Sequence, residues 1–563
     1  MDNSGWDPSR RLPTRLVLGV TLLVLCAPVA IDLGVSSRVR PFGYAAADTF
    51  YYLTVARNIA RHGSVSFDGV HPTNGFHPLW QFVTAALHFG TEKLGMAEHT
   101  VLATVVLSLV FVAGGVALLG LAFANSGRLT PLFALLPVGV YGLLLAPFWL
   151  ARRSWLAEHS MEGPFPLYGT LFSYVNGMES GAVLLSFGLC AYTQRAWNRE
   201  PSALRALAFG LCLAALALSR LDHVFVSVPL LAAFVGTTRQ RGRSYPDAVA
   251  AFFGLVVPVG SAVLVNLRWF GSAMPVSGSL KTSFPFVTSV HVQNWIDTWN
   301  HGSGYNLWLL QSEASLLVPM LFALGYLALT FRTRFIGTNL ALGYRESARD
   351  YERFLAPVAA GVAMLATYDF LFLVEPPGSW YFPVSTLFVS LAAIALVERA
   401  RPRLGRRAAA LALVATSALG VWFFLRFHRQ PEYHAEYARL YWVEAPELKR
   451  SFGKTPPRLV EYDDGIVSYA LDAPAMSSGY TLDPEGVDAL RAGRLYSLAY
   501  ERGFPCAATL VYHSAKALLV DRSPEAARAY AAAVIGADVS AYEFSVKHLT
   551  SSGSLAIVCG VKR

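Results

Sequence analysis

Charged residues are scarce in this sequence. Asp, Glu, Lys and Arg together make up 15% of the 563 residues, whereas 54% are hydrophobic, and the mean hydropathy is +0.41. Because soluble globular domains contain roughly 25% charged residues, this shortage excludes a wholly soluble protein. We therefore expect a polytopic membrane protein, mainly α-helical.

Cysteine is also rare, and no cysteine spacing matches a metal-binding motif. Cys26, Cys190 and Cys212 fall within apolar runs, where a cysteine behaves as a small buried hydrophobic residue. Cys506 and Cys559 lie in the polar C-terminal part. These two can pair if that part is exported, because oxidising compartments permit disulfides. The sequence leaves the pairing open, since it does not show their geometry.

A continuous basic face is missing as well. The net charge of +9 comes largely from arginines in short clusters between apolar runs. Such clusters are typical of membrane topology signals and not of a nucleic-acid-binding surface. The sequence has no evident internal repeat or low-complexity tract. We expect no nucleic-acid partner.

Long apolar runs recur along the chain. The first, from about Leu16 to Leu33, follows three arginines and is long enough to cross a bilayer as a helix. A cleaved signal peptide is the alternative, but the small residues at 45–47 lie too far beyond the run for the usual cleavage site. Further candidate spans lie at about 99–124, 130–150, 178–196, 203–220, 222–238, 247–269, 313–331, 354–374, 380–398 and 408–427.

The arginine clusters orient these spans. Arginines near 195–199, 239–243, 332–353 and 399–407 fall on one side, which the positive-inside rule makes cytoplasmic. Arg152 and Arg153 depart mildly from this pattern. The prediction is about eleven spans in a bacterial plasma membrane, with a cytoplasmic N-terminus and an extracytoplasmic C-terminus.

The composition changes near residue 428, after which acidic residues and lysines become frequent and no run is long enough to span. We therefore predict a transmembrane domain at 1–427 and a small soluble extracytoplasmic α/β domain at 428–563. Within the latter, we predict strands at 466–471, 517–520 and 555–561, and helices at 484–502 and 524–534.

A polar outer loop at 35–98 separates the first two predicted spans. We expect two surface helices in it, the first from Asp48 to His62, ended by Gly63, and the second from Gln81 to Leu94. Between them lies a segment rich in His, Pro, Asn and Gly, which is typical of a functional loop. Candidate substrate-binding residues in the outer loop are Arg57, Asn74, His77 and Trp80.

Charged residues beside predicted spans supply further candidates, because a charge near hydrocarbon is costly unless it is paired, hydrated or used. On the predicted outer side these are Asp48, Glu179, Arg220, Asp222 and Lys281, together with the aromatic pair Trp380 and Tyr381. A carboxylate there can act as a general base or metal ligand, and a cation can neutralise a phosphate.

Each candidate also has a purely structural interpretation. Asp48 is suited to cap its helix, and Glu179 to be a first-turn helix acid. Arg220 and Asp222 can neutralise each other, Lys281 can be a solvated loop residue, and the aromatic pair can belong to an interfacial belt. The spacing of His62, His71 and His77 matches no known metal-ligand pattern.

The order of several short motifs resembles the GT-C superfamily of integral-membrane glycosyltransferases. The first span is followed by DTFYYLTVARNIARHG, HPTNGFHPLW, NGMES, LSRLDH and FGSAMPVSGSLK. The likeness is closest to bacterial relatives of the mycobacterial arabinofuranosyltransferases, and more distant to the lipid A aminoarabinose transferase and protein O-mannosyltransferase families. Those families place one or two active-site acids just after the first span. Many show an Asp-Asp pair, but Ala47 precedes Asp48 here, which leaves Asp48 as the sole candidate at that motif.

The resemblance implies a polyprenyl-phosphate-linked sugar as donor and a glycan, lipid or protein as acceptor. We hypothesise that Asp48 is the general base of a single inverting displacement, and that Lys281 and Arg220 stabilise the leaving phosphate. Glu179 would position the acceptor or assist a bound cation. A divalent cation is neither required nor excluded by the sequence. The alternative is a transporter or flippase of a lipid-linked glycan, although inverted repeats and broken helices are not evident. A third interpretation is a cell-envelope interaction protein, which would leave the polar outer loop unexplained.

Overall fold

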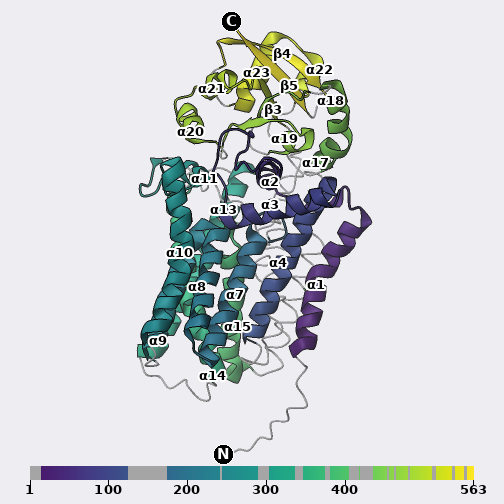
Figure 1. Ribbon diagram of the computed structural model, residues 1–563. Helices are drawn as coiled ribbons and strands as arrows, with labels where there is room; N and C mark the ends of the chain where they lie inside the picture. The colour runs from purple at the N-terminus through teal and green to yellow at the C-terminus, as the bar shows by residue number, and fades with distance from the viewer. Residues whose placement is uncertain are drawn as a thin grey trace, which may run out of the picture.

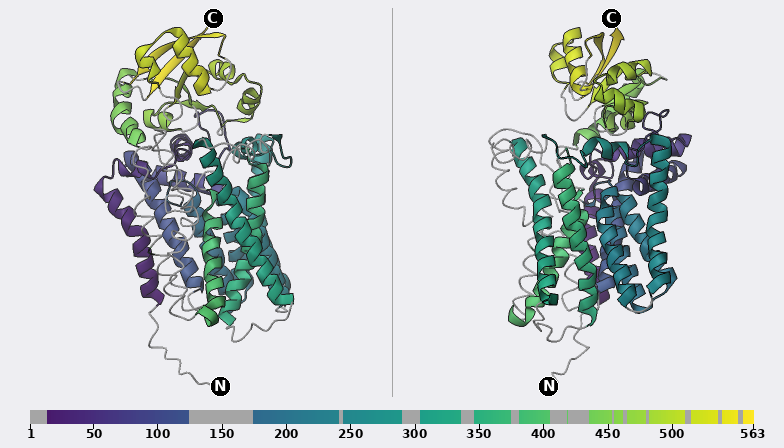
Figure 2. Two further views of the ribbon diagram at one scale, coloured as in Figure 1. Left: turned by 180° about the vertical axis from the view of Figure 1, so that it is seen from behind. Right: turned by 90° about the vertical axis from the view of Figure 1, so that its left-hand side faces the viewer.

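The computed structural model describes residues 14–123, 174–240, 244–289, 304–335, 346–374, 381–404, 418, 435–452, 455–461, 465–479, 482–509, 515–535, 539–550 and 555–563. The predicted span at 130–150, nearly all of that at 408–427, and Trp380 therefore lie outside the described residues. The chain forms a bundle of long helices with a smaller mixed domain above one end (Figures 1 and 2).

The bundle contains helices at most of the positions predicted for spans (Figure 1). They are α1 (Thr14–Val35), α4 (Thr100–Phe123), α7 (Ser180–Arg199), α8 (Ala203–Ser219), α9 (Val224–Gln240), α10 (Ser244–Phe270), α13 (Gly304–Phe335), α14 (Glu346–Phe372) and α15 (Pro383–Leu404). Within the described part of the chain, four helical segments are long and apolar enough to cross a membrane: Ala97–Phe123, Leu221–Gln240, Tyr245–Phe270 and Tyr351–Phe372. The chain is thus a multi-pass membrane protein, and the predicted total of about eleven spans is not confirmed.

Small residues let the central helices approach closely. A Cβ on Gly115 of α4 would lie 2.4 Å from the carbonyl oxygen of Leu184 on α7, and one on Gly188 of α7 would lie 2.5 Å from that of Gly115. Close approach of backbones at small residues is typical of helix pairs in membranes. This contact fixes α7, and with it Glu179 immediately before its first residue, against α4.

Two shorter helices lie between the bundle and the upper domain. The first, α2 (Thr49–His62), ends as predicted at Gly63, whose φ of 66° gives a left-handed C-cap. The second, α3 (Pro78–Lys93), begins three residues before the predicted start, because Pro78 is compatible with the first helical turn. Phe82 and Phe89 of α3 are exposed, as expected for a surface helix.

The upper domain is built on a five-stranded mixed sheet, consistent with the predicted α/β class. Its strand order is β2 (Ala475–Ser477), β1 (Leu459–Glu461), β3 (Cys506–Thr509), β5 (Ala556–Lys562) and β4 (Tyr542–Leu549). Strand β1 runs parallel to β2 and β3, whereas β5 is antiparallel to β3 and β4. The surrounding helical segments are α17 (Ala435–Arg439), a π-helix (Leu440–Glu444), α18 (Ala445–Phe452), α19 (Ile466–Leu471), α20 (Pro484–Arg491), α21 (Leu495–Glu501), α22 (Ala517–Val520) and α23 (Pro524–Ile535).

Two predicted strands of this domain are wrong. Residues 466–471 and 517–520 form the short helices α19 and α22, because the periodicity of a short apolar run does not distinguish a buried strand from a buried helix. The predicted helix at 484–502 is divided into α20 and α21 at Gly493, where φ is 66°. The predicted strand at 555–561 and the helix at 524–534 are confirmed as β5 and α23.

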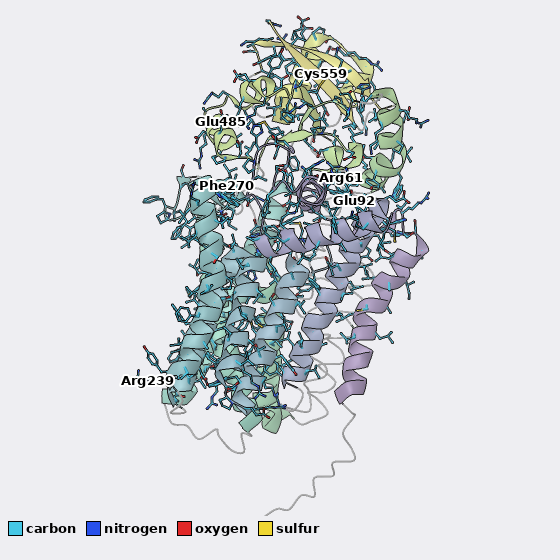
Figure 3. The ribbon with its side chains drawn as sticks, viewed as in Figure 1. Arg61, Glu92, Arg239, Phe270, Glu485 and Cys559 are labelled. Atoms are coloured by element: carbon cyan, nitrogen blue, oxygen red, sulfur yellow. A yellow bond between two sulfur atoms is a disulfide. The ribbon has the colours of Figure 1, made fainter. Side chains whose placement is uncertain are left out.

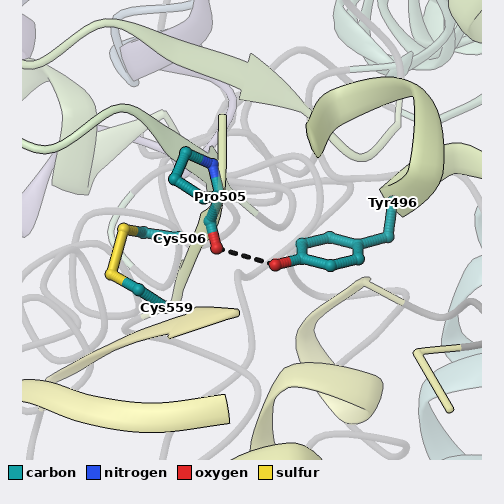
Figure 4. The surroundings of a disulfide bond; sticks show 4 residues. All are labelled: Tyr496, Pro505, Cys506 and Cys559. Atoms are coloured by element: carbon teal, nitrogen blue, oxygen red, sulfur yellow. Dashed lines mark hydrogen bonds between the residues drawn. A yellow bond between two sulfur atoms is a disulfide. The ribbon is translucent and has the colours of Figure 1, made fainter. Parts of the chain in front are cut away.

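Cys506 and Cys559 form a disulfide, which settles the pairing that the sequence leaves open. The two residues are directly paired across the antiparallel strands β3 and β5. Beside this bond, the Tyr496 hydroxyl donates a hydrogen bond to the carbonyl oxygen of Pro505 at 2.7 Å (Figure 4).

Candidate active site

A cavity of about 280 Å³ lies where α2, α7, α9 and α14 meet the short helix α11 (Val276–Lys281). Its lining includes residues from segments far apart in the sequence. Seven of the predicted site residues are among them: Asp48, His77, Glu179, Arg220, Asp222, Lys281 and Tyr381. The outer-side charges singled out from the sequence therefore meet at one cavity.

Asp48 immediately precedes α2 and faces Lys281. Its side chain makes no capping hydrogen bond to the helix, so the capping interpretation does not account for this residue. The Asp48 Oδ2 and Lys281 Nζ atoms are 3.9 Å apart, and the two side chains are 21% and 18% exposed. An acid and a cation thus share a partly accessible part of the cavity, where both can reach a substrate.

The end of α14 holds the segment that carries Lys281. The backbone amide of Val374 donates to the carbonyl oxygen of Lys281 at 2.9 Å, and that of Ser283 donates to the carbonyl oxygen of Phe372 at 2.9 Å. These main-chain bonds flank an isolated antiparallel β-bridge between Thr282 and Leu373. Lys281 is therefore placed by backbone geometry, unlike the solvated loop lysine of the structural interpretation.

Arg220 is buried between two carboxylates. Its Nη1 donates to Glu179 Oε1 at 2.6 Å, and its Nε donates to Asp222 Oδ2 at 2.9 Å. Glu179 is fully buried and makes no side-chain capping bond to α7. Removing one partner of such a buried pair typically costs about 3–5 kcal/mol, because it leaves the other charge buried without compensation.

Two further contacts complete the cluster. The guanidinium carbon of Arg220 lies 3.6 Å from the centre of the Tyr381 ring, a cation–π arrangement. Asp222 Oδ1 is 2.6 Å from His223 Nδ1. Tyr381 thus faces the cavity and contacts Arg220, so membership of an interfacial belt does not describe its environment.

His77 is held as a neutral imidazole. The backbone amide of Leu221 donates to its Nδ1 at 3.3 Å, so we assign the proton to Nε2, which lies 3.7 Å from Glu179 Oε1. Burial lowers the pKa of His77 from 6.5 to about 4. At neutral pH this side chain can donate a hydrogen bond but carries no charge.

Three predicted substrate-binding residues do not line the cavity. Arg57 points to the upper domain, where it donates to the carbonyl oxygen of Tyr469 at 3.1 Å. Asn74 donates to Asn266 Oδ1 and accepts from the amide of Val276, each at 3.1 Å. Trp80 is buried, and its Nε1 donates to the carbonyl oxygen of Gly177 at 3.1 Å.

These three residues support the cavity instead of forming its wall. Asn74 anchors the start of α11, Trp80 anchors the loop before α7, and Arg57 joins α2 to the upper domain. The sequence places all three in the polar outer loop but does not show which way a side chain points.

Tyr52 is a cavity residue that the sequence analysis missed. Its hydroxyl donates to Glu179 Oε2 at 3.2 Å and accepts from the amide of His77 at 3.4 Å. It lies one helical turn after Asp48, so the periodicity of α2 was the available signal.

Among the described residues, no group of three or more His, Cys, Asp or Glu side chains is arranged to hold a metal ion, and we derive no step through a metal.

No protein-family model matches this chain, and no curated protein matches it in sequence. Solved structures do match. ArnT from Cupriavidus metallidurans in the apo state aligns with a TM-score of 0.50 and 14% identity, covering 97% of each chain. The same ArnT bound to undecaprenyl phosphate aligns with a TM-score of 0.46 and 12% identity, covering 97% of this chain and 98% of that one. The chain therefore shares the fold of apo ArnT, in line with the predicted GT-C fold, whereas the closer likeness to arabinofuranosyltransferases is not confirmed.

Proposed function

We propose that this protein is a membrane glycosyltransferase that moves a sugar from a polyprenyl-phosphate donor to a glycan, lipid or protein acceptor. The observation that carries the proposal is the cavity in which a partly exposed carboxylate, Asp48, faces Lys281 beside the buried Arg220 cluster. The fold shared with ArnT supports a GT-C enzyme. A multi-pass bundle is also in keeping with a donor whose isoprenoid chain lies in the bilayer.

In the proposed reaction, Asp48 accepts the proton of an acceptor hydroxyl while the hydroxyl oxygen attacks the anomeric carbon. A new glycosidic C–O bond forms as the bond from the anomeric carbon to the phosphate oxygen breaks. The polyprenyl phosphate leaves with the electron pair of that bond. One displacement of this kind inverts the anomeric configuration.

Lys281 is the better placed of the two cations to receive the leaving phosphate. Arg220 is already neutralised by Glu179 and Asp222, whereas Lys281 is partly exposed and lies 3.9 Å from the carboxylate that it faces. As phosphate charge develops, an ammonium at that position becomes more strongly attracted to it, which lowers the barrier. Arg220 lines the cavity while paired with Glu179 and Asp222. Neutral His77 is available to donate a hydrogen bond.

We further propose that the transmembrane and upper domains divide near residue 428. The cavity and the upper domain face the extracytoplasmic side of a bacterial plasma membrane in this proposal. The disulfide in the upper domain supports this orientation, because disulfides persist in oxidising compartments. It agrees with Arg239, which lies at the other end of the bundle (Figure 3).

The test is transfer from a panel of radiolabelled polyprenyl-phosphate sugars with purified wild type and Asp48→Asn. We expect the variant to lose at least about 100-fold in rate, because removal of a general base commonly costs 10²–10⁴-fold. Glu98→Gln is the matched control, since Glu98 is an exposed acid of the same outer region and does not line the cavity. Undiminished transfer by folded Asp48→Asn would show that Asp48 is not the general base.

The same assay separates the transporter alternative. A glycosyltransferase releases free polyprenyl phosphate, whereas a flippase leaves the donor intact. Wild-type protein that moves the labelled donor across vesicles without any release would favour the flippase.

A further inference from the structure

The upper domain contacts α2 along most of its length. Phe50 near the start of α2 belongs to the same hydrophobic cluster as Tyr437, Ile466 and Tyr469 of the upper domain. The Phe50 ring lies 5.5 Å from that of Tyr437 and 5.9 Å from that of Tyr469. The helix that begins beside Asp48 thus shares a core with the upper domain.

At its start, α19 meets the first turns of α2 without space for a side chain. A Cβ on Gly465 would lie 2.9 Å from the carbonyl carbon of Phe50 and 3.0 Å from the amide nitrogen of Tyr51. The Thr54 hydroxyl also donates to the carbonyl oxygen of Gly465 at 3.4 Å. This backbone contact lies two residues from Asp48.

At its end, α19 is bound by two arginines of α2. Arg57 donates to the carbonyl oxygens of Ser468 and Tyr469 at 3.4 and 3.1 Å, and its Nη1 lies 2.9 Å from Asp472 Oδ1. Arg61 donates to both Asp472 carboxylate oxygens at 2.9 Å. The carbonyl oxygens of Ser468 and Tyr469 also accept backbone amides at the C-cap of α19. Arg57 thus adds a cation at the negative end of the α19 dipole, and Arg61 pairs with Asp472 just after it.

Each partner in this contact is fixed on its other side. The amides of Val467 and Ser468 in α19 donate to the Glu461 carboxylate of β1 at 2.7 and 3.0 Å. On the membrane side, Arg61 Nε lies 2.5 Å from Glu92 of α3, and Figure 3 shows both residues at the boundary between bundle and domain. The contact therefore runs from the sheet through α19 to α2 and α3.

We propose that Arg57 and Arg61 are positioning residues, and that the upper domain fixes the catalytic helix α2 through them. The inference rests on the proposed role of Asp48 as general base. With 14 residues, α2 is too short to be stable alone in water, so its position depends on what it packs against. Because a displacement of about 1 Å at a reacting group costs on the order of 100-fold in rate, this contact sets the rate without touching substrate.

The experiment compares Arg57→Met, Arg57→Lys and Arg61→Met with wild type in the transfer assay. We expect Arg57→Met to lower kcat by about 10-fold to 100-fold with the donor KM changed less than about 2-fold, as expected for misplacement of a reacting group. Arg57→Lys retains the charge and is expected to recover part of the rate. Arg61→Met is the milder variant, since Arg61 is 34% exposed.

Arg502→Met is the matched control. Arg502 binds Asp483 through two bonds of 2.9 Å inside the upper domain, so its loss perturbs the domain without removing a contact to α2. If Arg502→Met lowers kcat as much as Arg57→Met at matched thermal stability, the positioning role is overturned.

A second measurement separates positioning from general destabilisation. Arg57→Met is combined with Asp48→Glu, which already displaces the carboxylate by one methylene group. If Arg57 acts through Asp48, Arg57→Met lowers kcat less in this background than in wild type. If its effect is an independent one on folding, the loss of kcat is the same in both. Full independence of the two changes would overturn the inference.

The inference and the proposed function fail in different ways. If Asp48→Asn keeps its activity, the proposed role of Asp48 as general base is wrong, whatever result the Arg57 variants give. If Asp48→Asn is inactive but Arg57→Met and Arg61→Met both retain wild-type kcat, only the positioning role is wrong.

Discussion

His77 shows how one buried side chain acquires a defined protonation state. Its Nδ1 accepts a hydrogen bond from the amide of Leu221, which requires an unprotonated nitrogen. Burial away from water disfavours the imidazolium, and the pKa falls to about 4. The residue was identified from sequence as a candidate, but its neutral form follows from its neighbours.

This gives a prediction for pH dependence. The pKa of His77 is lowered from 6.5 to about 4, so between these values the unfolded chain binds the proton and the folded chain does not. Stability should therefore fall as the pH drops from about 6.5 to about 4, by up to about 3 kcal/mol from this group. Thermal unfolding in detergent should show that His77→Gln loses less stability than wild type as the pH falls from about 6.5 to about 4. Equal acid sensitivity would contradict the prediction.

At the scale of elements, the start of α2 depends on a close contact with the loop before α7. Gly177 has a φ of +75°, and a Cβ there would lie 2.6 Å from Cγ2 of Thr49. The Thr49 hydroxyl donates to the carbonyl oxygen of Asn176 at 2.8 Å. Because Thr49 follows Asp48 directly, this contact helps to place the carboxylate.

Gly177→Ala should therefore reduce both stability and transfer rate. Gly63→Ala is the control, since Gly63 has a similar φ of +66° but a Cβ added there would meet no atom within 4 Å. Each variant should lose about 1–2 kcal/mol through left-handed strain. Only Gly177→Ala should also lower kcat, by about 10-fold, because it displaces Thr49. Steady-state kinetics with thermal unfolding tests this, and equal kcat in both variants would be the contrary result.

At the scale of the whole molecule, the upper domain and helices α2 and α11 lie at one end of the bundle, and the end of α9 lies at the other (Figures 1 and 3). Residues of α2 and α11 line the cavity. This separation makes orientation measurable. Val520 on α22 is 93% exposed, whereas Gln240 ends α9 at the opposite end.

We predict that a membrane-impermeant maleimide labels Val520→Cys in right-side-out vesicles, and labels Gln240→Cys only after the membrane is permeabilised. The physical reason is the arginine excess at the α9 end together with the disulfide at the other. Wild type, whose free cysteines Cys26, Cys190 and Cys212 lie in helices of the bundle, gives the background. Reversed labelling would invert the proposed topology.

Local patterns in the sequence determined the helices and the candidates. Hydropathy located most of the bundle helices, Gly63 ended α2, and the polar interruptions and outer loop supplied seven residues that line the cavity. These inferences succeeded because span length, capping and the cost of a charge near hydrocarbon depend on nearby residues alone.

Only the tertiary structure decided which of these residues meet. Asp48 and Lys281 face each other because α14 holds the Lys281 segment by main-chain bonds. Arg57 turns away from the cavity because carbonyl oxygens at the end of α19 and the Asp472 carboxylate bind it. Residues 466–471 form a helix that packs against α2, although their apolar run is equally suited to a strand. Side-chain direction and long-range pairing depend on contacts between distant segments, which a linear pattern does not contain.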